Sequence, residues 1–260
     1  MTDAKPRISV VTITLNRRDF LEKAIRSVLA QDYANFEHIV IDGGSTDGTV
    51  EMIKRYPHLR WNSEPDTGQA NAMNKGVARV EGELFGWLNS DDTYPPGTFA
   101  TVARYASELS PEVAMIYGTC TLVDRHGSVI GHTRYRPFDK HRLRMGFNNI
   151  NTPAVFLRTD VFRELGTFDE SLRATYDVDF WARIAERYRL HAVPEPFSNL
   201  CLHDGSGLVS TRHHLTEMPR LREKYWTKRT WFDRWVRYPY LSLREQLYYR
   251  IKFSSLLRKI

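Results

Sequence analysis

The stretch LFGWLNSDD, residues 84–92, carries the two features that decide the fold. Its first five residues are apolar without alternation, as in a short strand buried on both faces of a parallel sheet. A polar run follows at once and places two adjacent carboxylates, Asp91 and Asp92, where the strand ends. In parallel sheets, ligands bind beyond the carboxyl ends of the strands. The stretch therefore predicts an α/β fold with an acidic site at that edge.

Three strand-and-helix units precede this strand. Residues 7–14 (RISVVTIT), 36–41 (FEHIVI) and 59–62 have strand character, and helical patterns follow at 20–29, 46–56 and 68–80. This alternation predicts a mostly parallel, Rossmann-type sheet with helices on both faces. Polar residues follow the strands at Asn16, Asp42 and Asp66. We expect these side chains to gather near Asp91.

The second half of the chain is less regular. Residues 115–132 predict antiparallel strands with a turn at 124–127, and 153–158 predict a further strand with a short helix after it. Residues 178–189 have the apolar spacing of a helix. Because no repeat or Gly/Ser-rich linker interrupts the chain, we expect one domain over residues 1–215, with a small antiparallel part, and a helical tail over 216–260.

Composition narrows the class of protein. Of the 260 residues 42% are hydrophobic and 26% charged, which excludes a disordered or collagen-like chain. The two cysteines, Cys120 and Cys201, form no CxxC pair, so we expect a reduced protein without structural zinc. No apolar run approaches the roughly 18 residues of a membrane span, and the N-terminus lacks a signal-peptide pattern. We therefore expect a cytoplasmic protein.

The positive charge is concentrated in the tail. The formal net charge is +6, yet residues 219–260 hold 12 basic and 3 acidic residues and 10 of the 32 aromatic ones, including Trp226, Trp231 and Trp235. Cations interleaved with Trp and Tyr suit an anionic membrane surface, so we expect peripheral attachment to the inner membrane face. Nucleic acid would attract the same charges but is not an expected partner. A helical appendage packed on the domain, with residues 243–257 amphipathic, is the simpler alternative.

The paired acids and the glycine-rich loop each allow two interpretations. Adjacent carboxylates repel unless a cation compensates them, and Mg²⁺ or Mn²⁺ shares its ligands between carboxylates and substrate phosphates. The alternative is that Asp92 caps the following turn. The loop DGGSTDGT, residues 42–49, lets a ligand approach closely, or is a βα turn with Ser45 or Thr46 as the helix cap. It is neither a Walker A loop nor a G-x-G-x-x-G motif.

Two aspartates and a histidine in the second half are further candidates. Asp177 and Asp179 point to different sides of a predicted helix, so we expect one to face a site and the other to stabilise the helix N-terminus. His203 follows later in the chain, where an ordinary surface or core histidine is the alternative to a ligand.

These motifs together resemble an inverting family 2 glycosyltransferase of the GT-A fold. The resemblance is carried by ISVVTITLNR (8–17), HIVIDGGSTDGT (38–49), SEPDTGQANAMNKG (63–76) and LFGWLNSDD (84–92). Two later runs, NTPAVFLRTDVFRELGTFDE (151–170) and ATYDVDFWARIAE (174–186), are similar to the family's acceptor-side half. The match spans about residues 7–210, with the motifs in the family's order.

The resemblance implies roles for particular residues. Asn89-Ser90-Asp91 stands at the family's D-x-D, with Asn in place of the first Asp, and Asp91 is then the principal ligand of Mn²⁺ or Mg²⁺. Asp177 matches the catalytic base, although Tyr176 replaces the Glu before it, and His203 completes the metal shell. The implied donor-binding residues are Thr14, Asn16, Asp42, Asp66, Gln69, Asn74, Lys75, Asn89, Ser90 and Asp92.

The implied reaction is transfer of a sugar from a nucleotide-diphosphate donor to a hydroxyl of a glycan or lipid-linked acceptor. Such a hexosyltransferase would act in cell-surface polysaccharide synthesis. Relatives often carry a second, uracil-contacting acid where this chain has Gly43, so Asp66 supplies that contact or the nucleotide differs. A UDP-sugar is favoured, and GDP- or dTDP-sugars stay open. The alternatives are a nucleotidyltransferase, which should show a Gly- and Lys-rich loop near the first strand, and a non-catalytic nucleotide-sugar-binding module.

Overall fold

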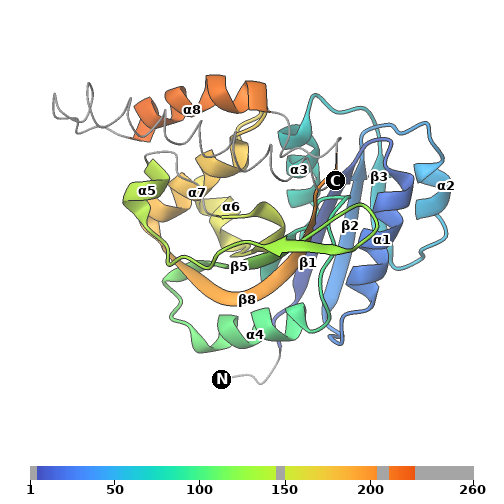
Figure 1. The fold of residues 1–260 in the computed structure, drawn as a ribbon, viewed down its shortest axis with the longest axis horizontal. Coiled ribbons are helices and arrows are strands. Elements are labelled where there is room, and N and C mark those ends of the chain that lie inside the picture. Colours follow the sequence, from blue (N-terminus) through green and yellow to red (C-terminus); the bar gives the residue numbers. More distant parts are fainter. Residues whose placement is uncertain (1–4, 145–149, 204–210, 226–260) are drawn as a thin grey trace.

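The computed structural model describes residues 5–144, 150–203 and 211–225. Most of the predicted tail, including the amphipathic segment 243–257 and the three tail tryptophans, lies outside these residues. The described part is built around one eight-stranded sheet in the order β3-β2-β1-β4-β7-β5-β6, with β8 paired to β5 (Figure 1).

The predicted parallel half of the sheet is confirmed. Strands β1 (Ile8–Thr14), β2 (Phe36–Asp42), β3 (Leu59–Ser63) and β4 (Leu84–Trp87) run parallel, with β1 between β2 and β4. Their carboxyl ends therefore meet at one edge of the sheet. In register, Thr14 of β1 lies opposite Asp42 of β2, which in turn lies opposite Ser63 of β3.

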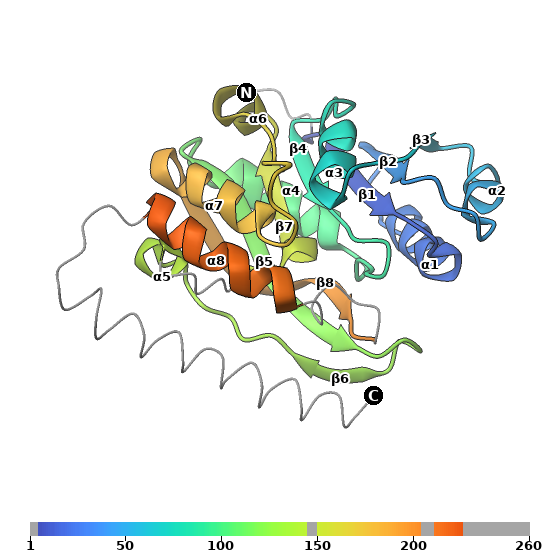
Figure 2. The ribbon, with the colours of Figure 1, turned by 90° about the horizontal axis from the view of Figure 1, so that it is seen from above.

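The second half of the sheet is largely antiparallel. Strand β7 (Val155–Arg158) pairs antiparallel with β4 and with β5 (Val113–Val123), and β5 pairs antiparallel with β6 (Val129–His132). The β5–β6 hairpin extends away from the parallel strands (Figure 2). Strand β8 (Arg189–Cys201), which the sequence did not suggest, runs parallel to β5 along its length. Pro194 and Pro196 explain why no strand signal is seen in the sequence here, because prolines argue against a strand unless it lies at an edge or a bulge.

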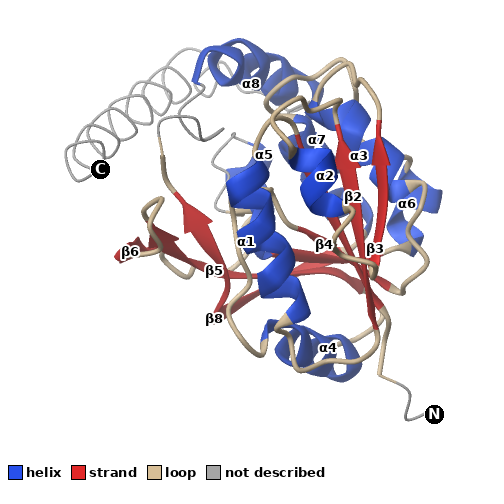
Figure 3. Ribbon diagram, turned by 90° about the vertical axis from the view of Figure 1, so that its right-hand side faces the viewer, coloured by secondary structure: helices blue, strands red, loops and turns tan. Residues whose placement is uncertain are grey.

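Helices cover both faces of the sheet, as the alternating pattern predicts (Figure 3). Helices α1 (Arg18–Leu29), α2 (Thr49–Ile53) and α4 (Thr98–Glu108) contribute buried residues to one side. Helices α3 (Gln69–Val77), α5 (Lys140–Arg144), α6 (Asp160–Leu165), α7 (Tyr176–Arg187) and α8 (Thr211–Tyr225) contribute to the other. Successive residues of β1 divide accordingly: Val10 packs on the first side and Val11 on the second.

Two close contacts position the loops at the carboxyl edge. Helix α3 packs so tightly on β1 that a Cβ at Gly76 would overlap Val11. This close approach fixes the position of α3 against the sheet. At the end of β4, the Trp87 ring stacks on Tyr176 of α7, with centroids 5.5 Å apart, and meets Phe168 edge-on. The start of α7 is therefore held beside the end of β4.

Helix α8 runs across the predicted domain boundary at residue 215 and packs on the domain. Its Met218 and Leu221 are buried in the same core as α7. Both cysteines are buried free thiols. Within the described residues, no helix combines the length and apolar character needed to cross a bilayer.

Candidate functional site

The ends of β4 and β8 bring two predicted metal ligands together. The carboxylate of Asp91 lies 3.0 Å from Nε2 of His203, although the two residues are 112 positions apart. Each side chain is 11% exposed, so the pair lies just beneath the surface. The ring of Phe20 stacks on His203 with centroids 4.5 Å apart and fixes the plane of the imidazole.

Arg17 is the member of this cluster that the sequence did not single out. Its Nη1 lies 2.5 Å from Oδ2 of Asp91 and 3.4 Å from Nε2 of His203. The only signal for it was position, because Arg17 directly follows Asn16 at the end of the first strand. The guanidinium supplies the positive charge that an aspartate at this depth requires.

The Asp91–His203 pair fits a divalent metal that shares its ligands with a substrate. A carboxylate oxygen and an imidazole nitrogen are both ligands that Mn²⁺ accepts. Within residues 5–144, 150–203 and 211–225, no three His, Cys, Asp or Glu side chains are grouped so that they could hold a metal ion. Phosphate oxygens of a bound donor would have to complete the shell, as is usual for Mg²⁺ at nucleotide sites.

The other residues of the NSDD element point into the protein. Asp92 is 1% exposed and accepts hydrogen bonds from the Cys201 backbone N–H (2.9 Å) and from Nδ2 of Asn89 (2.8 Å). Burial, together with the charge of Asp91, raises the pKa of Asp92 well above its usual range. Asn89 also accepts from the indole N–H of Trp87, and Ser90 is buried. Asp91 is thus the acid of this element that meets Arg17 and His203.

The loop after β2 is organised by its own aspartate. Asp42 is fully buried, and its carboxylate accepts from the N–H groups of Gly44 (3.2 Å) and Ser45 (2.9 Å) and from the Ser63 hydroxyl (2.6 Å). One of the two interpretations of this loop required Ser45 or Thr46 to cap helix α2; neither does, because Gly48 is the N-cap residue. Oδ1 of Asp47 instead accepts from the Thr49 N–H at the start of the helix (3.1 Å).

Asp66 occupies the room that a second acid after Asp42 would need. A Cβ built on Gly43 would lie 2.5 Å from Oδ2 of Asp66. The Asp66 carboxylate is partly exposed and accepts from the Gly68 N–H at 2.8 Å. Nearby, the hydroxyl of Thr14 is buried without a hydrogen-bond partner among the described residues. A buried unpaired hydroxyl at the end of a strand is available to a ligand.

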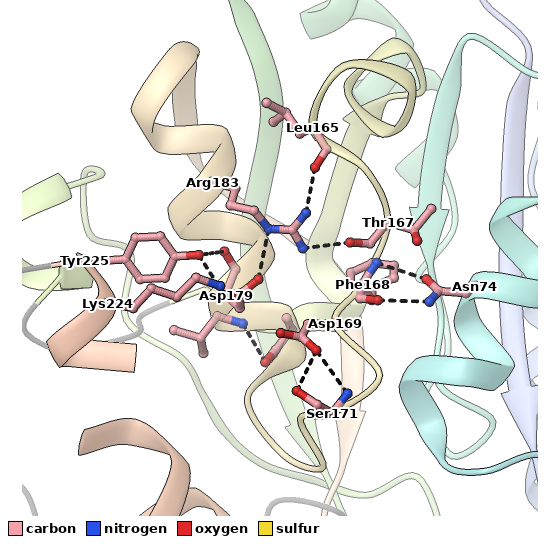
Figure 4. A network of polar contacts seen from close by, with 12 residues as sticks. Asn74, Leu165, Thr167, Phe168, Asp169, Ser171, Asp179, Arg183, Lys224 and Tyr225 are labelled. Atoms are coloured by element: carbon pink, nitrogen blue, oxygen red, sulfur yellow. Dashed lines mark hydrogen bonds and ion pairs between the residues drawn. The ribbon is translucent and has the colours of Figure 1, made fainter. Parts of the chain in front are cut away.

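The remaining donor-binding candidates join loops to one another. Asn16 has φ 51°, a conformation that asparagine tolerates, and its Oδ1 accepts from the Thr46 N–H (2.8 Å). Asn74 bonds both the N–H and the carbonyl of Phe168 (Figure 4). Lys75 donates to Pro65 O, and Gln69 accepts from the Tyr176 hydroxyl; the bond lengths are 2.9 and 3.0 Å.

Asp177 lies in the first turn of α7 and is partly buried. Oδ2 accepts from the Thr152 hydroxyl at 2.9 Å, and Oδ1 accepts from the Val178 N–H at 2.7 Å. Burial raises the pKa of the Asp177 carboxyl, while the Thr152 hydrogen bond opposes part of that rise. A carboxylate with a raised pKa and a free lone pair is suited to take a proton.

Asp179 lies in the first turn of α7, as expected, and its carboxylate is engaged by side chains of α7 and α8. It is fully buried and bonds the Arg183 guanidinium at 2.9 Å, Lys224 Nζ at 2.7 Å and the Tyr225 hydroxyl at 2.6 Å (Figure 4). The cause is tertiary: α8 brings two donors to this aspartate from 45 and 46 residues away. Asp179 therefore joins α7 to α8.

Comparison with solved structures supports the fold. Residues 1–349 of S. aureus TarS match with a TM-score of 0.68 at 18% identity, over 84% of this chain and 65% of that one. The mannosyltransferase PcManGT from Pyrobaculum calidifontis, solved in complex with GDP-Man and Mn²⁺, matches with a TM-score of 0.67 at 21% identity, over 88% and 66%. At these identities the likeness concerns the fold.

Sequence comparison identifies the family. An uncharacterized glycosyltransferase of Mycobacterium tuberculosis is 32% identical over 97% of this chain and 96% of its own length. Another, of Rickettsia felis, is 29% identical over 80% of this chain, which spans about a third (34%) of that relative's length. The model of the family described as "Glycosyl transferase family 2" matches residues 9–165. The chain therefore belongs to glycosyl transferase family 2.

Proposed function

We propose that this glycosyltransferase transfers a hexose, with inversion and with Mn²⁺ or Mg²⁺, from a nucleotide-diphosphate donor to a hydroxyl of a glycan or lipid-linked acceptor in cell-surface polysaccharide synthesis. One observation carries the proposal. Asp91 and His203 converge at the end of β4, and the Trp87–Tyr176 stack holds the start of α7, with Asp177, beside the same strand end. The proposed metal ligands and the proposed base thus lie at the same edge of the sheet.

For the donor, Asp66 and Thr14 are the favoured contacts to the nucleoside. Asp66 fills the place of the missing second acid, and the Thr14 hydroxyl has no protein partner among the described residues. Asp42, Asn74 and Lys75 would act indirectly by shaping the loops. Structural neighbours have been solved with UDP-GlcNAc and with GDP-Man, so we favour a UDP-sugar and keep a GDP-sugar as the second candidate.

At the phosphates, Asp91 and His203 would hold the metal, which would supply positive charge next to the leaving diphosphate. Arg17 contributes a second positive charge at the same point. In this structure Arg17 bonds Asp91. A bound diphosphate would present several oxygen acceptors, which arginine can bind in its preferred bidentate geometry.

At the acceptor, Asp177 would take the proton of the attacking hydroxyl. Attack from the side opposite the leaving group inverts the anomeric carbon. The aspartate is placed for this task because Thr152 and the Val178 N–H hold the carboxylate while leaving lone pairs unused.

Replacement of the candidate base tests its role. We expect Asp177→Asn to lower turnover by about 10² to 10⁴-fold, the usual contribution of general-base catalysis, because the amide cannot accept the proton. Nucleotide affinity should be unchanged. Turnover of UDP-GlcNAc or GDP-mannose with Mn²⁺ and calorimetry with UDP or GDP measure the two effects. Asp19→Asn, at an acid whose side chain is 91% exposed, is the control. Near-normal turnover by Asp177→Asn would reject the base.

The pH profile tests the environment of Asp177. The base works deprotonated, so activity falls as pH drops through its pKa, which burial raises above the ordinary aspartate value. Thr152→Val removes the hydrogen bond that lowers this pKa. We therefore expect the acidic limb of the kcat profile to move to higher pH. Thr101→Val on α4, on the opposite face of the sheet, should leave the limb in place. A shift to lower pH, or none, contradicts the assignment.

Removal of the metal ligands tests the donor site. We expect Asp91→Ala and His203→Ala to weaken Mn²⁺-dependent nucleotide binding by at least about 10-fold, a loss that even outer-shell partners of a metal produce. Calorimetric titration of UDP or GDP with and without Mn²⁺ measures it. Asp32→Ala, at an exposed acid, is the matched control. Unchanged nucleotide affinity in Asp91→Ala would reject the proposed metal site. Unchanged Mn²⁺ affinity in His203→Ala would show that His203 is not a metal ligand.

The basic tail is proposed to attach the enzyme to an anionic membrane surface, where lipid-linked acceptors lie. Because α8 packs on the domain through Met218 and Leu221, the test deletes only residues 226–260. We expect this deletion to abolish co-sedimentation with vesicles rich in anionic phospholipid, since each basic residue near such a surface contributes about 1 kcal/mol. Neutral vesicles are the control. Equal binding by the full and shortened chains would exclude the role.

A further inference from the structure

The segment that leads into α7 is held by a carboxylate from α8. Glu217, only 7% exposed, accepts hydrogen bonds from the backbone N–H groups of Arg173 (2.7 Å), Ala174 (3.0 Å) and Thr175 (3.0 Å). It also accepts from the Thr175 hydroxyl at 2.9 Å. Three successive N–H groups that converge on one anion form a nest, and the dipole of the helix beyond adds to the attraction.

The same face of α8 makes a second attachment two turns further on. Lys224 and Tyr225 both bond Asp179, which is fully buried within α7 (Figure 4). Residues separated by seven or eight positions lie on one side of a helix, so Glu217 and this pair face α7 together. Met218 and Leu221 are buried between them.

The Glu217 contact ends two residues before the candidate base. Asp177 follows Thr175 and Tyr176, whose ring stacks on Trp87. The backbone position of 173–175 therefore determines where the Asp177 carboxylate meets Thr152 and an acceptor hydroxyl. An arrangement of this kind is sensitive, because a displacement of about 1 Å can lower catalysis about 10²-fold.

We propose that Glu217 is a positioning residue for Asp177, so that helix α8 is part of the catalytic machinery rather than an appendage. This inference rests on the proposed function, because it takes Asp177 as the base. It adds a residue that lies beyond the part of the chain matched by the family model, residues 9–165. The negative charge of Glu217 acts in the same direction as burial and raises the pKa of Asp177.

The first test separates positioning from general stability. Glu217→Ala should lower kcat for hydrolysis of UDP-GlcNAc or GDP-mannose by about 10²-fold, with the donor KM within about two-fold of wild type, since the hydrogen bonds of Glu217 go to residues 173–175 and not to the proposed donor contacts. Glu217→Gln keeps one acceptor oxygen and should recover part of the lost kcat. Glu223→Ala, at an exposed acid of the same helix, should behave as wild type. An unchanged kcat in Glu217→Ala, or an equal loss in Glu223→Ala, overturns the proposal.

The second test asks whether Glu217 acts through Asp177. In the double variant Asp177→Asn with Glu217→Ala, kcat should equal that of Asp177→Asn alone, because a positioning residue has no effect once its base is gone. Losses that multiply would show that Glu217 acts by another route and would overturn the proposal.

A third measurement does not depend on the reaction. Amide hydrogen exchange in Glu217→Ala should rise over residues 173–178 and stay unchanged over β1, β2 and β4. Unchanged exchange at 173–175 would overturn the proposal even in an active enzyme. If Asp177→Asn keeps full turnover, the base assignment fails, and the exchange result still shows whether Glu217 holds the start of α7.

Discussion

The site depends on compensation of the negative charge at the end of β4. Two adjacent aspartates follow a fully buried strand, and the structure treats them differently. Asp91 is stabilised by the Arg17 guanidinium and by His203. Asp92 is withdrawn from water, bonded to Asn89 and Cys201, and its pKa is raised. One carboxylate thereby stays close to the surface, and the other connects the loop to β8.

The two halves of the site are connected by packing rather than by a continuous segment of chain. Trp87 ends the strand that leads to Asp91, and its ring stacks on Tyr176, the residue before Asp177. Tyr176 also donates to Gln69 at the start of α3, and Asn74 of the same helix bonds the Phe168 backbone. Buried aromatic contacts and satisfied polar groups of this kind permit little relative movement. Packing in the core therefore sets the position of the Asp91–His203 pair relative to Asp177.

Several residues that the family pattern marks as donor-binding are engaged within the protein. The Asp42 carboxylate accepts hydrogen bonds from the loop that follows it and from Ser63 of β3, and Asn74 and Lys75 donate to backbone carbonyls of neighbouring loops. Asp66 and Thr14 keep capacity for a ligand, because Asp66 is partly exposed and the Thr14 hydroxyl has no partner among the described residues. Residues of a family motif can thus organise the loops of a site through hydrogen bonds within the protein.

The sequence by itself determined the parallel strands, the helices on both faces and the polar residues at the strand ends. These follow from local hydrophobic periodicity and from the rule that parallel strands end at one edge. Contacts between distant segments were decided only by the tertiary structure. Four contacts join segments far apart in the chain: Arg17 with Asp91, β8 with β5, Asp179 with α8, and Glu217 with the start of α7. Such contacts leave no periodic signal, because burial and charge pairing depend on which residues the completed fold brings together.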